Sequence, residues 1–342
     1  MIPKKAVRRM IDAILHPFGF RLMRESLLLG WQKNRERIKY SYNKVKLPEG
    51  ADDYLSQNNE KLVQLTRLYA SLDTAVVTPS LWTSKHLRPI DLKYFRGDNP
   101  YVWQFRDYNF ETSYVMTTYY VKTIDTLNLL EKLKEDDEFG IYTFKVGNQV
   151  VSRDFLDSII EIYFLEKHLG ISRLPHIKLL DIGAGYGRLA HRMVEALPNI
   201  DYYFCTDAVP SSTFISEYYL CFRNVHNKAR VVALHELEDV LANHSIDIAI
   251  NVHSFSECTT TAIDWWLSKL AKHKIRYLMI VPAYIDPDGR LLVCHTREDY
   301  LPIVERYGYS LLAKEPKYRD PAVQRYGVTP TYHYLFELSS RS

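Results

Sequence analysis

The chain has 342 residues, of which 46% are hydrophobic and 25% charged, values that are ordinary for a globular protein with a sizeable core. The formal net charge of +3 is too small to indicate a nucleic-acid partner, and no apolar run approaches the roughly 20 residues of a membrane span. The cysteines form no C-x-x-C pair, which favours reduced thiols in a cytoplasmic protein.

Residues 3–15 predict a basic amphipathic helix. Lysines and arginines between residues 4 and 9 lie on one side, and apolar residues follow helical spacing on the other. Asp12 interrupts the apolar stretch and no small-residue cleavage site follows, which argues against a signal peptide. Residues 1–20 therefore either contact an anionic membrane surface, at the inner membrane face, or pack on the protein with solvated cations.

The region 51–175 is expected to be mainly helical and to form a cap on the domain that follows it. Helical periodicity covers 53–72 and 112–133, and the aromatic segment 81–110 is either a saccharide platform or simple core. A hairpin is predicted over 142–151, turning at Gly147-Asn148. Ser152 then caps a helix that runs to about residue 168, and its first residues, Arg153 and Asp154, face either a cleft or solvent.

From residue 178 the pattern changes to alternating strands and helices, which predicts a parallel sheet with right-handed crossovers. The chain divides into 1–50 (basic helix and linker), 51–175 (cap) and 176–342 (α/β domain). The predicted strands are 178–183, 202–207, 230–234, 246–252 and 277–283, with helices at about 187–197, 211–223, 237–243 and 260–272. A helix at 297–307 and two strand-like runs, 309–314 and 331–338, follow.

Alternate glycines follow the first of these strands, in the run Asp181-Ile182-Gly183-Ala184-Gly185-Tyr186-Gly187. Glycine is needed where a backbone turns tightly and approaches a ligand closely, and the helix behind offers unpaired N–H groups. A dinucleotide motif would need glycine at position 188, where the chain has Arg188. The D-x-G-x-G-x-G spacing resembles the first motif of the class I S-adenosylmethionine (SAM) methyltransferases; an ordinary strand–turn–helix junction is the alternative.

Two later strand ends carry suitable polar residues. Asp207 ends the second strand, where an acid accepts hydrogen bonds from ribose hydroxyls or caps the helix that starts at Pro210. The fourth strand opens onto His253. In class I methyltransferases the end of this strand lies beside the transferable methyl group.

Further segments along roughly residues 80–338 carry a more specific resemblance: Gly140, 151–158, 182–190, 207–210, 218–220, 251–257 and Glu315-Pro316. Together they resemble the bacterial sugar O-methyltransferases, although Cys258 stands where that family is expected to have methionine. The resemblance implies a Rossmann-like class I methyltransferase domain with a seven-stranded, mostly parallel sheet that is completed by an antiparallel hairpin. It also implies a mainly helical cap that binds the acceptor, SAM as cofactor and a saccharide or glycoconjugate as acceptor.

His253 is the first candidate for a general base, because an alcohol must lose a proton as it attacks a methyl group and imidazole accepts protons near neutral pH. The alternative is a histidine that only hydrogen-bonds backbone. Glu257, one helical turn further, orients His253, serves as base itself, or is a helix N-terminal acid. His295 is another candidate, in a loop past the fifth strand, because such loops line the ligand crevice of parallel sheets.

The cofactor contacts follow from the same resemblance. The glycines give close approach, Asp181 holds the turn and the amino-acid end of SAM, Ala208 flanks the adenine, and Asn251 neighbours the methionine part. His235 and Glu236 follow the third strand and reach the exocyclic amine. The predicted cofactor-binding set is Asp181, Gly183, Ala184, Gly185, Gly187, Asp207, Ala208, His235, Glu236 and Asn251.

The sequence has no tight His/Asp/Glu cluster with ligand spacing, so no metal ligands are assigned, while a need for a divalent metal stays open. Two rival functions also stay open. One is an O-methyltransferase with a lipid or polyketide hydroxyl as acceptor, and the other is a SAM-binding scaffold without catalysis. The oligomeric state is not indicated.

Overall fold

The computed structural model describes residues 46–77, 92–97, 111–283 and 292–339, together with Ile11, Ile14 and Leu15. Most of the predicted N-terminal helix at 3–15, most of the aromatic segment 81–110 and the part of the loop past the fifth predicted strand at residues 284–291 lie outside the described residues. No helix in the described part of the chain is both long enough and apolar enough to cross a membrane.

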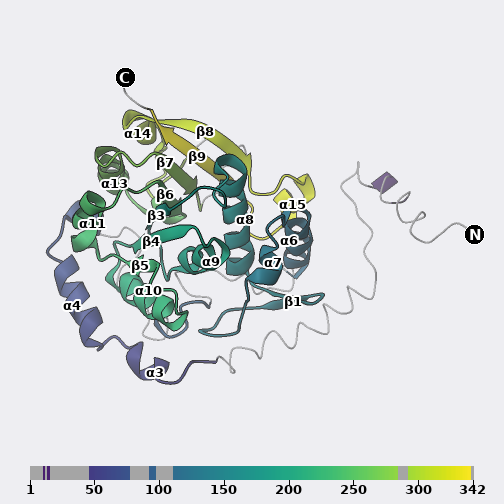
Figure 1. Cartoon of the computed structure of the whole chain (residues 1–342), viewed down its shortest axis with the longest axis horizontal. Coiled ribbons are helices and arrows are strands. Elements are labelled where there is room, and N and C mark those ends of the chain that lie inside the picture. Colours follow the sequence, from purple (N-terminus) through teal and green to yellow (C-terminus); the bar gives the residue numbers. More distant parts are fainter. Residues whose placement is uncertain are drawn as a thin grey trace, which may run out of the picture.

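The described residues form a seven-stranded sheet with the strand order β5-β4-β3-β6-β7-β9-β8 (Figure 1). The first five strands of this order are parallel, and β9 runs antiparallel to both of its neighbours. This confirms the predicted Rossmann-like α/β fold and its final antiparallel hairpin. The strands are β3 (Ile177–Ile182), β4 (Ile200–Thr206), β5 (Ala229–Val231), β6 (Ile248–Val252), β7 (Tyr277–Val281), β8 (Tyr309–Pro316) and β9 (Tyr332–Leu338).

The order of the strands explains where a ligand can bind. The chain moves outward from β3 through β4 to β5, then returns and moves the other way from β6 to β7. Right-handed crossovers therefore place α9 and α10 on one face and α11 and α13 on the other (Figure 1). The reversal between β3 and β6 is a topological switch point, which opens a crevice at the carboxyl ends of these strands. The helices of this part are α9 (Arg188–Ala196), α10 (Pro210–Phe222), α11 (Leu237–Asn243), α12 (Ser254–Glu257), α13 (Thr260–Lys272) and α14 (Leu301–Arg306), with a 3₁₀ helix at Leu234–Glu236.

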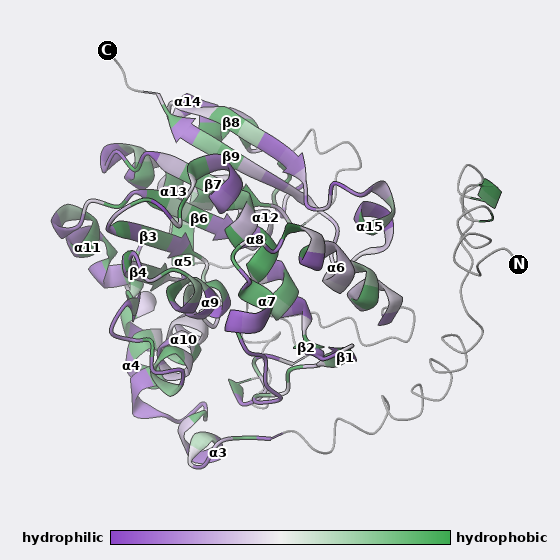
Figure 2. Ribbon diagram, turned by 45° about the vertical axis from the view of Figure 1, so that its right-hand side comes forward, coloured by the Kyte–Doolittle hydropathy of each residue, from purple (hydrophilic) through white to green (hydrophobic). Residues whose placement is uncertain are grey.

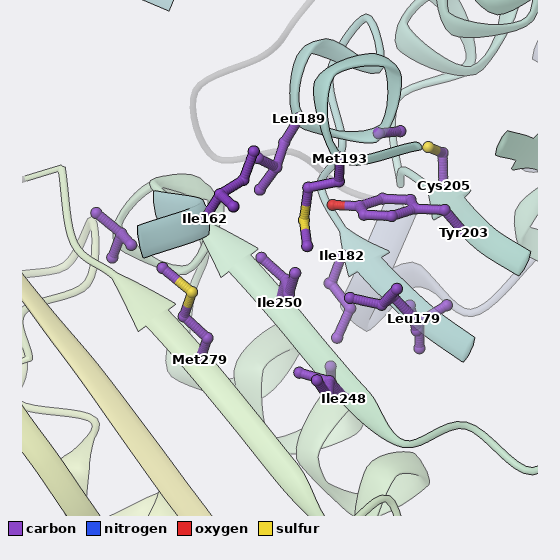
Figure 3. Packing of buried hydrophobic residues seen from close by; sticks show 14 of the residues in the cluster. Ile162, Leu179, Ile182, Leu189, Met193, Tyr203, Cys205, Ile248, Ile250 and Met279 are labelled. Carbon is purple, nitrogen blue, oxygen red and sulfur yellow. The ribbon is translucent and has the colours of Figure 1, made fainter. Parts of the chain in front are cut away.

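The core of the sheet is apolar on both faces, as expected for parallel strands that are covered by helices. Figure 3 shows Ile182 of β3, Ile250 of β6 and Met279 of β7 beside Leu189 and Met193 of α9. All five side chains are at most 2% exposed. The strands are therefore short apolar runs that end where polar residues meet the crevice.

The region before the sheet is mainly helical, as predicted, and contains one hairpin. Its helices are α3 (Ala51–Tyr54), α4 (Glu60–Tyr69), α5 (Thr74–Val77), α6 (Glu111–Ile124), α7 (Leu129–Lys132) and α8 (Arg153–Leu169), and its strands are β1 (Phe144–Val146) and β2 (Gln149–Val151). The predicted turn at Gly147 is confirmed by its φ of +63°, and the Ser152 hydroxyl accepts from the Phe155 N–H as the predicted N-cap of α8.

Three predicted helices differ from the observed ones for local reasons. The run 53–72 is two helices because Asn59 caps α4 by accepting from the Lys61 N–H. The run 112–133 divides at Asp125, whose carboxylate accepts from the Leu129 N–H and competes with a continuous helix. The helix expected from 297 begins at Leu301, because Arg297 has a φ of +68° that no right-handed helix allows.

The N-terminal region contacts the sheet domain at several places. Along one edge, α4 packs on α10, and the Tyr69 hydroxyl bonds Thr213 Oγ1 and the Leu234 N–H. Elsewhere α8, which carries both hydrophobic and hydrophilic residues (Figure 2) and is buried along most of its length, packs between α6 and α9. The segment between β8 and β9, with α15 (Pro321–Tyr326), also reaches this region, since the Val328 N–H donates to Thr117 of α6. The sequence reading did not predict α15.

A buried ionic cluster joins the two parts. The Glu135 carboxylate accepts from Arg96 at 2.5 Å, from Arg192 of α9 at 2.9 Å, and from the Ser152 hydroxyl. The side chains of Glu135, Arg96 and Arg192 are at most 3% exposed. Burial raises the pKa of Glu135, but the two guanidinium groups outweigh it, so the pKa lies below its usual range and the group stays charged.

Candidate functional site

A cavity of about 170 Å³ lies at the carboxyl ends of β3, β4 and β6. One water needs only roughly 10–15 Å³ of such space, so the cavity is large enough for part of an organic ligand. Eight of the residues predicted from sequence line it: Asp181, Gly183, Ala184, Gly185, Asp207, Ala208, His253 and Glu257.

The glycine loop consists of residues 183–187, and its residues 183–186 line this cavity. The N–H groups of Gly183 and Ala184 donate to the Thr206 carbonyl at 2.9 and 3.2 Å, which ties the loop to the end of β4. A Cβ on Gly183 would lie 2.2 Å from Ser254 Oγ, so packing against α12 demands glycine there. Gly185, with a φ of +58°, has no heavy atom within 4 Å of its Cβ position, so a ligand can approach its backbone.

Gly187 has a different role from the other two glycines. It precedes α9 with a φ of +84°, and a Cβ there would meet Ser216 and Leu220 of α10 at 3.0 and 3.1 Å. The residue is absent from the lining of the cavity described above. Its glycine is explained by close packing between α9 and α10 and by the positive φ.

Asp207 follows β4 and is held by two backbone donors. Its Oδ2 accepts from the Gly185 N–H at 3.1 Å and its Oδ1 from the Val209 N–H at 2.8 Å. Burial raises the pKa of Asp207 to about 6, although these bonds favour the charged form. The carboxylate thus fixes the loop, supports the start of α10 and lines the cavity at the position where α/β folds bind ribose hydroxyls.

Asp181 lies deeper, near the end of β3. Its carboxylate accepts from the Tyr203 hydroxyl at 2.9 Å, and its side chain is 3% exposed. Burial raises the pKa of Asp181 to about 7. A second donor or a positive group from a ligand would stabilise its charged form.

His253 follows β6 in an unusual backbone conformation. Its φ is +68° and its N–H donates to the Val281 carbonyl of β7 at 2.7 Å. A positive φ is rare for residues other than glycine and stores strain, which is common at functional sites. Burial, with a further contribution from Arg153, lowers the pKa of His253 well below its usual value. The imidazole is therefore neutral at pH 7, and it lines the cavity beside Glu257 of α12.

Other predicted site residues lie elsewhere. Asn251 is fully buried; its Nδ2 donates to the Ile182 carbonyl and its Oδ1 accepts from the Phe255 N–H, both at 2.9 Å, so it joins β3 to α12. His235 and Glu236 are exposed in the 3₁₀ helix after β5. His295 donates its N–H to the Cys258 carbonyl at 3.1 Å. These four residues do not line the cavity.

Several lining residues were not predicted. Tyr186 and Arg188 belong to the glycine loop and the start of α9, and both bond to α8: the Tyr186 hydroxyl donates to Asp154, and the Arg188 guanidinium donates to both oxygens of Glu161 at 2.8 and 3.0 Å. Val76 of α5 and Trp266 of α13 come from distant elements, and no local pattern marks them. Within the described parts of the chain, no three His, Cys, Asp or Glu side chains are placed to hold a metal ion.

Comparison with known proteins gives likenesses in structure alone. No protein-family model and no curated protein matches the sequence. Among solved structures, the precorrin-6y C5,15-methyltransferase from Geobacter metallireducens GS-15 is 14% identical, with a TM-score of 0.35 over 53% of this chain and 88% of that one. The magnesium protoporphyrin IX methyltransferase from Synechocystis PCC 6803, with S-adenosylhomocysteine (SAH) bound, is 13% identical, with a TM-score of 0.38 over 55% and 83%.

A third structure in this group is the [4+2]-cyclase SpnF, which is 13% identical with a TM-score of 0.38 over 53% of this chain and 81% of that one. At such identities and TM-scores these likenesses carry no inference about activity.

Proposed function

We propose that the chain is a SAM-dependent O-methyltransferase whose acceptor is a sugar hydroxyl. The observation that carries this proposal is the order of groups along one cavity. Asp207 after β4, the open backbone of Gly185 after β3 and the imidazole of His253 after β6 line it together. In this proposal the Asp207 carboxylate accepts hydrogen bonds from the ribose hydroxyls of SAM. The Gly185 backbone leaves space for SAM to lie close to it, and His253 accepts a proton.

The residues present fit the cofactor. Asp207 offers carboxylate oxygens to the ribose hydroxyls, and the space over Gly185 admits a ligand against the backbone. Burial raises the pKa of Asp181 to about 7, and the positively charged amino group of SAM would stabilise the charged form of this carboxylate. When bound, SAM supplies a methyl group on a positively charged sulfur.

In this proposal His253 is the general base. An imidazole nitrogen of His253 would accept the hydroxyl proton as the acceptor oxygen bonds the methyl carbon and the bond from that carbon to the cofactor sulfur breaks, with the sulfur keeping the electron pair. Burial and nearby cations lower the pKa of His253, so the ring is neutral and has a free lone pair at neutral pH. The sugar as acceptor is supported by the resemblance of the 151–158 and 251–257 segments to sugar O-methyltransferases.

The proposal is tested by methyl transfer from labelled SAM to a panel of nucleotide sugars, free oligosaccharides and lipid extracts, with and without a chelator. We expect label on a saccharide. Label in lipid alone would instead favour the lipid or polyketide acceptor. No label, from protein that binds SAM by calorimetry, would favour the inactive scaffold. The chelator samples report whether a divalent metal is needed.

Asp207→Ala should weaken SAM binding by about 10- to 100-fold, because hydrogen bonds to a charged group contribute roughly 1.5–3 kcal/mol. Isothermal titration calorimetry measures the change, and circular dichroism checks that the fold is retained. Asp239→Ala, on the exposed side of α11, is the matched control and should bind like the unaltered protein. Unchanged affinity in Asp207→Ala would remove this residue from the ribose site.

The affinity for SAM should also depend on pH. The pKa of Asp207 is raised to about 6, so the charged acceptor is present above this value and is lost as the pH falls through it. We expect weaker binding at pH 5.5 than at pH 7.5. The side chain in Asp207→Asn does not titrate, so the SAM affinity of this variant should change less with pH. If the SAM affinity of both proteins changed equally with pH, a group other than Asp207 would be responsible.

A further inference from the structure

Asn251 joins the two central strands at the point where they separate. Strands β3 and β6 are paired in parallel as far as Asp181 and Ile250, whereas β6 stays paired with β7 through Val252. Beyond Ile250 the Asn251 side chain spans the opening, because its Nδ2 donates to the Ile182 carbonyl at 2.9 Å. A side-chain amide therefore continues the connection between these strands where their backbone pairing ends.

The other end of the same amide holds the start of α12. Asn251 Oδ1 accepts from the Phe255 N–H at 2.9 Å, so the side chain bridges from β3 across residue 253 to the next helix. Asn251 and Phe255 are both 0% exposed. Loss of either hydrogen bond would leave a buried backbone group without its partner, which costs more than the loss of an exposed bond.

His253 lies inside this bridged turn and has a strained backbone. Its φ of +68° is rare outside glycine, and its ψ of −30° lies outside the left-handed helical region at about +30 to +60°. The turn is also held by the His253 N–H, which donates to the Val281 carbonyl at 2.7 Å, and by the Ser256 N–H, which donates to the His253 carbonyl at 3.0 Å. Strained conformations persist only where the surrounding structure over-determines them.

We propose that Asn251 is a positioning residue for His253: its amide holds the strained turn, and the turn keeps the imidazole at the cavity. This inference rests on the proposed function, because it takes His253 as the general base. His253 lines the cavity and Asn251 does not, so the amide acts through the backbone and not on the substrate. Without the amide the turn can relax to a negative φ, which would move the imidazole away from the reacting atoms.

The inference is tested with Asn251→Leu, which has a side chain of similar shape and removes both hydrogen bonds. We expect kcat at saturating SAM to fall about 100-fold, because a displacement of roughly 1 Å at a reacting group has an effect of this size. SAM affinity by calorimetry should stay within about fivefold, since the interaction that is lost matters in the transition state. Asn199→Leu is the matched control and should keep near-normal kcat. The Asn199 amide also bonds two backbone carbonyls, but at the opposite end of the sheet.

The NMR resonance of the His253 imidazole, assigned by its loss in His253→Asn, gives a readout that needs no turnover. We expect it to shift or broaden in Asn251→Leu and to stay unchanged in Asn199→Leu. Asn251→Asp keeps the shape and covers the case in which Asn251→Leu does not fold. A protonated carboxyl accepts and donates as the amide does, whereas a carboxylate only accepts. The kcat of Asn251→Asp should therefore fall, relative to that of the unaltered protein, as the pH rises from about 6 to about 8, because burial raises the pKa of a carboxyl into this range.

An unshifted His253 resonance or a near-normal kcat in Asn251→Leu overturns the inference, as does the same pH dependence of kcat in Asn251→Asp and the unaltered protein. A fall in SAM affinity as large as the fall in kcat also overturns it, because Asn251 would then support the whole site and not His253 in particular. If the resonance shifts but the unaltered protein methylates nothing in the panel, the proposed function fails while the positioning of His253 by Asn251 stands.

Discussion

Glu135→Ala should lower the free energy of unfolding by about 3–5 kcal/mol, because it leaves two buried guanidinium groups without their shared carboxylate. Arg96 and Arg192 are 1% and 3% exposed and bond to the same oxygen of Glu135. A loss of this size is a large part of the roughly 5–15 kcal/mol that stabilises an ordinary domain. The cluster also joins the N-terminal region to α9, so both parts should loosen together.

Urea denaturation followed by circular dichroism measures this effect. Glu131→Ala, an exposed acid of the nearby α7, is the matched control and should change the unfolding free energy by less than about 0.5 kcal/mol. Glu135→Gln keeps an acceptor but not the charge, so its loss should be intermediate. A fall of under 1 kcal/mol in Glu135→Ala would mean that the remaining acceptors, Asp136 for Arg96 and the Lys134 carbonyl for Arg192, or water replace the lost carboxylate.

His253→Asn should lower kcat about 10²- to 10⁴-fold if the imidazole is the general base of methyl transfer. Asparagine is the informative replacement because it tolerates the positive φ of +68° at this position better than alanine does. The backbone N–H that donates to Val281 is unchanged in the variant. SAM affinity should therefore stay within about threefold while turnover is lost.

Initial rates with the acceptor found in the labelled-SAM panel measure this prediction, and calorimetry measures SAM affinity on the same samples. His295→Asn is the comparison, since His295 does not line the cavity, and it should keep near-normal turnover. Near-normal kcat in His253→Asn would place the base elsewhere, with Glu257 as the next lining residue to replace.

The sheet could be predicted from the sequence because most of its parallel strands are short apolar runs, and a polar residue follows two of them, Asp207 after β4 and His253 after β6. The predicted strand 246–252 corresponds to β6, Ile248–Val252, and 277–283 to β7, Tyr277–Val281. The helical breaks at Asn59 and Asp125 were not predicted, because a single side chain that bonds the backbone leaves the apolar periodicity intact.

The site could be predicted only where it is local in the sequence. The glycine loop, Asp207 and His253 lie at strand ends, and the parallel order brings such ends together. His235 and Asn251 also follow or end strands, yet one is exposed and the other bonds within the fold. Val76 and Trp266 reach the cavity because their helices fold over it, and no short-range pattern encodes that approach. For Arg153 the sequence left a cleft and solvent as alternatives, and the structure places this residue in the cavity lining.

The segment between β8 and β9 has a consequence for the order in which the chain folds during synthesis. Its Lys317 pairs with Asp157 across 160 positions, and its Val328 bonds Thr117 across 211 positions. Helices α6 and α8 leave the ribosome early. Their partners Lys317, for Asp157, and the Val328 N–H, for Thr117, are made only when nearly the whole sequence shown has been translated. Pairings this distant are slow to form and leave apolar surface exposed meanwhile. The N-terminal helices therefore cannot finish folding ahead of the sheet, and a nascent chain stalled before residue 317 should depend on chaperones to stay soluble.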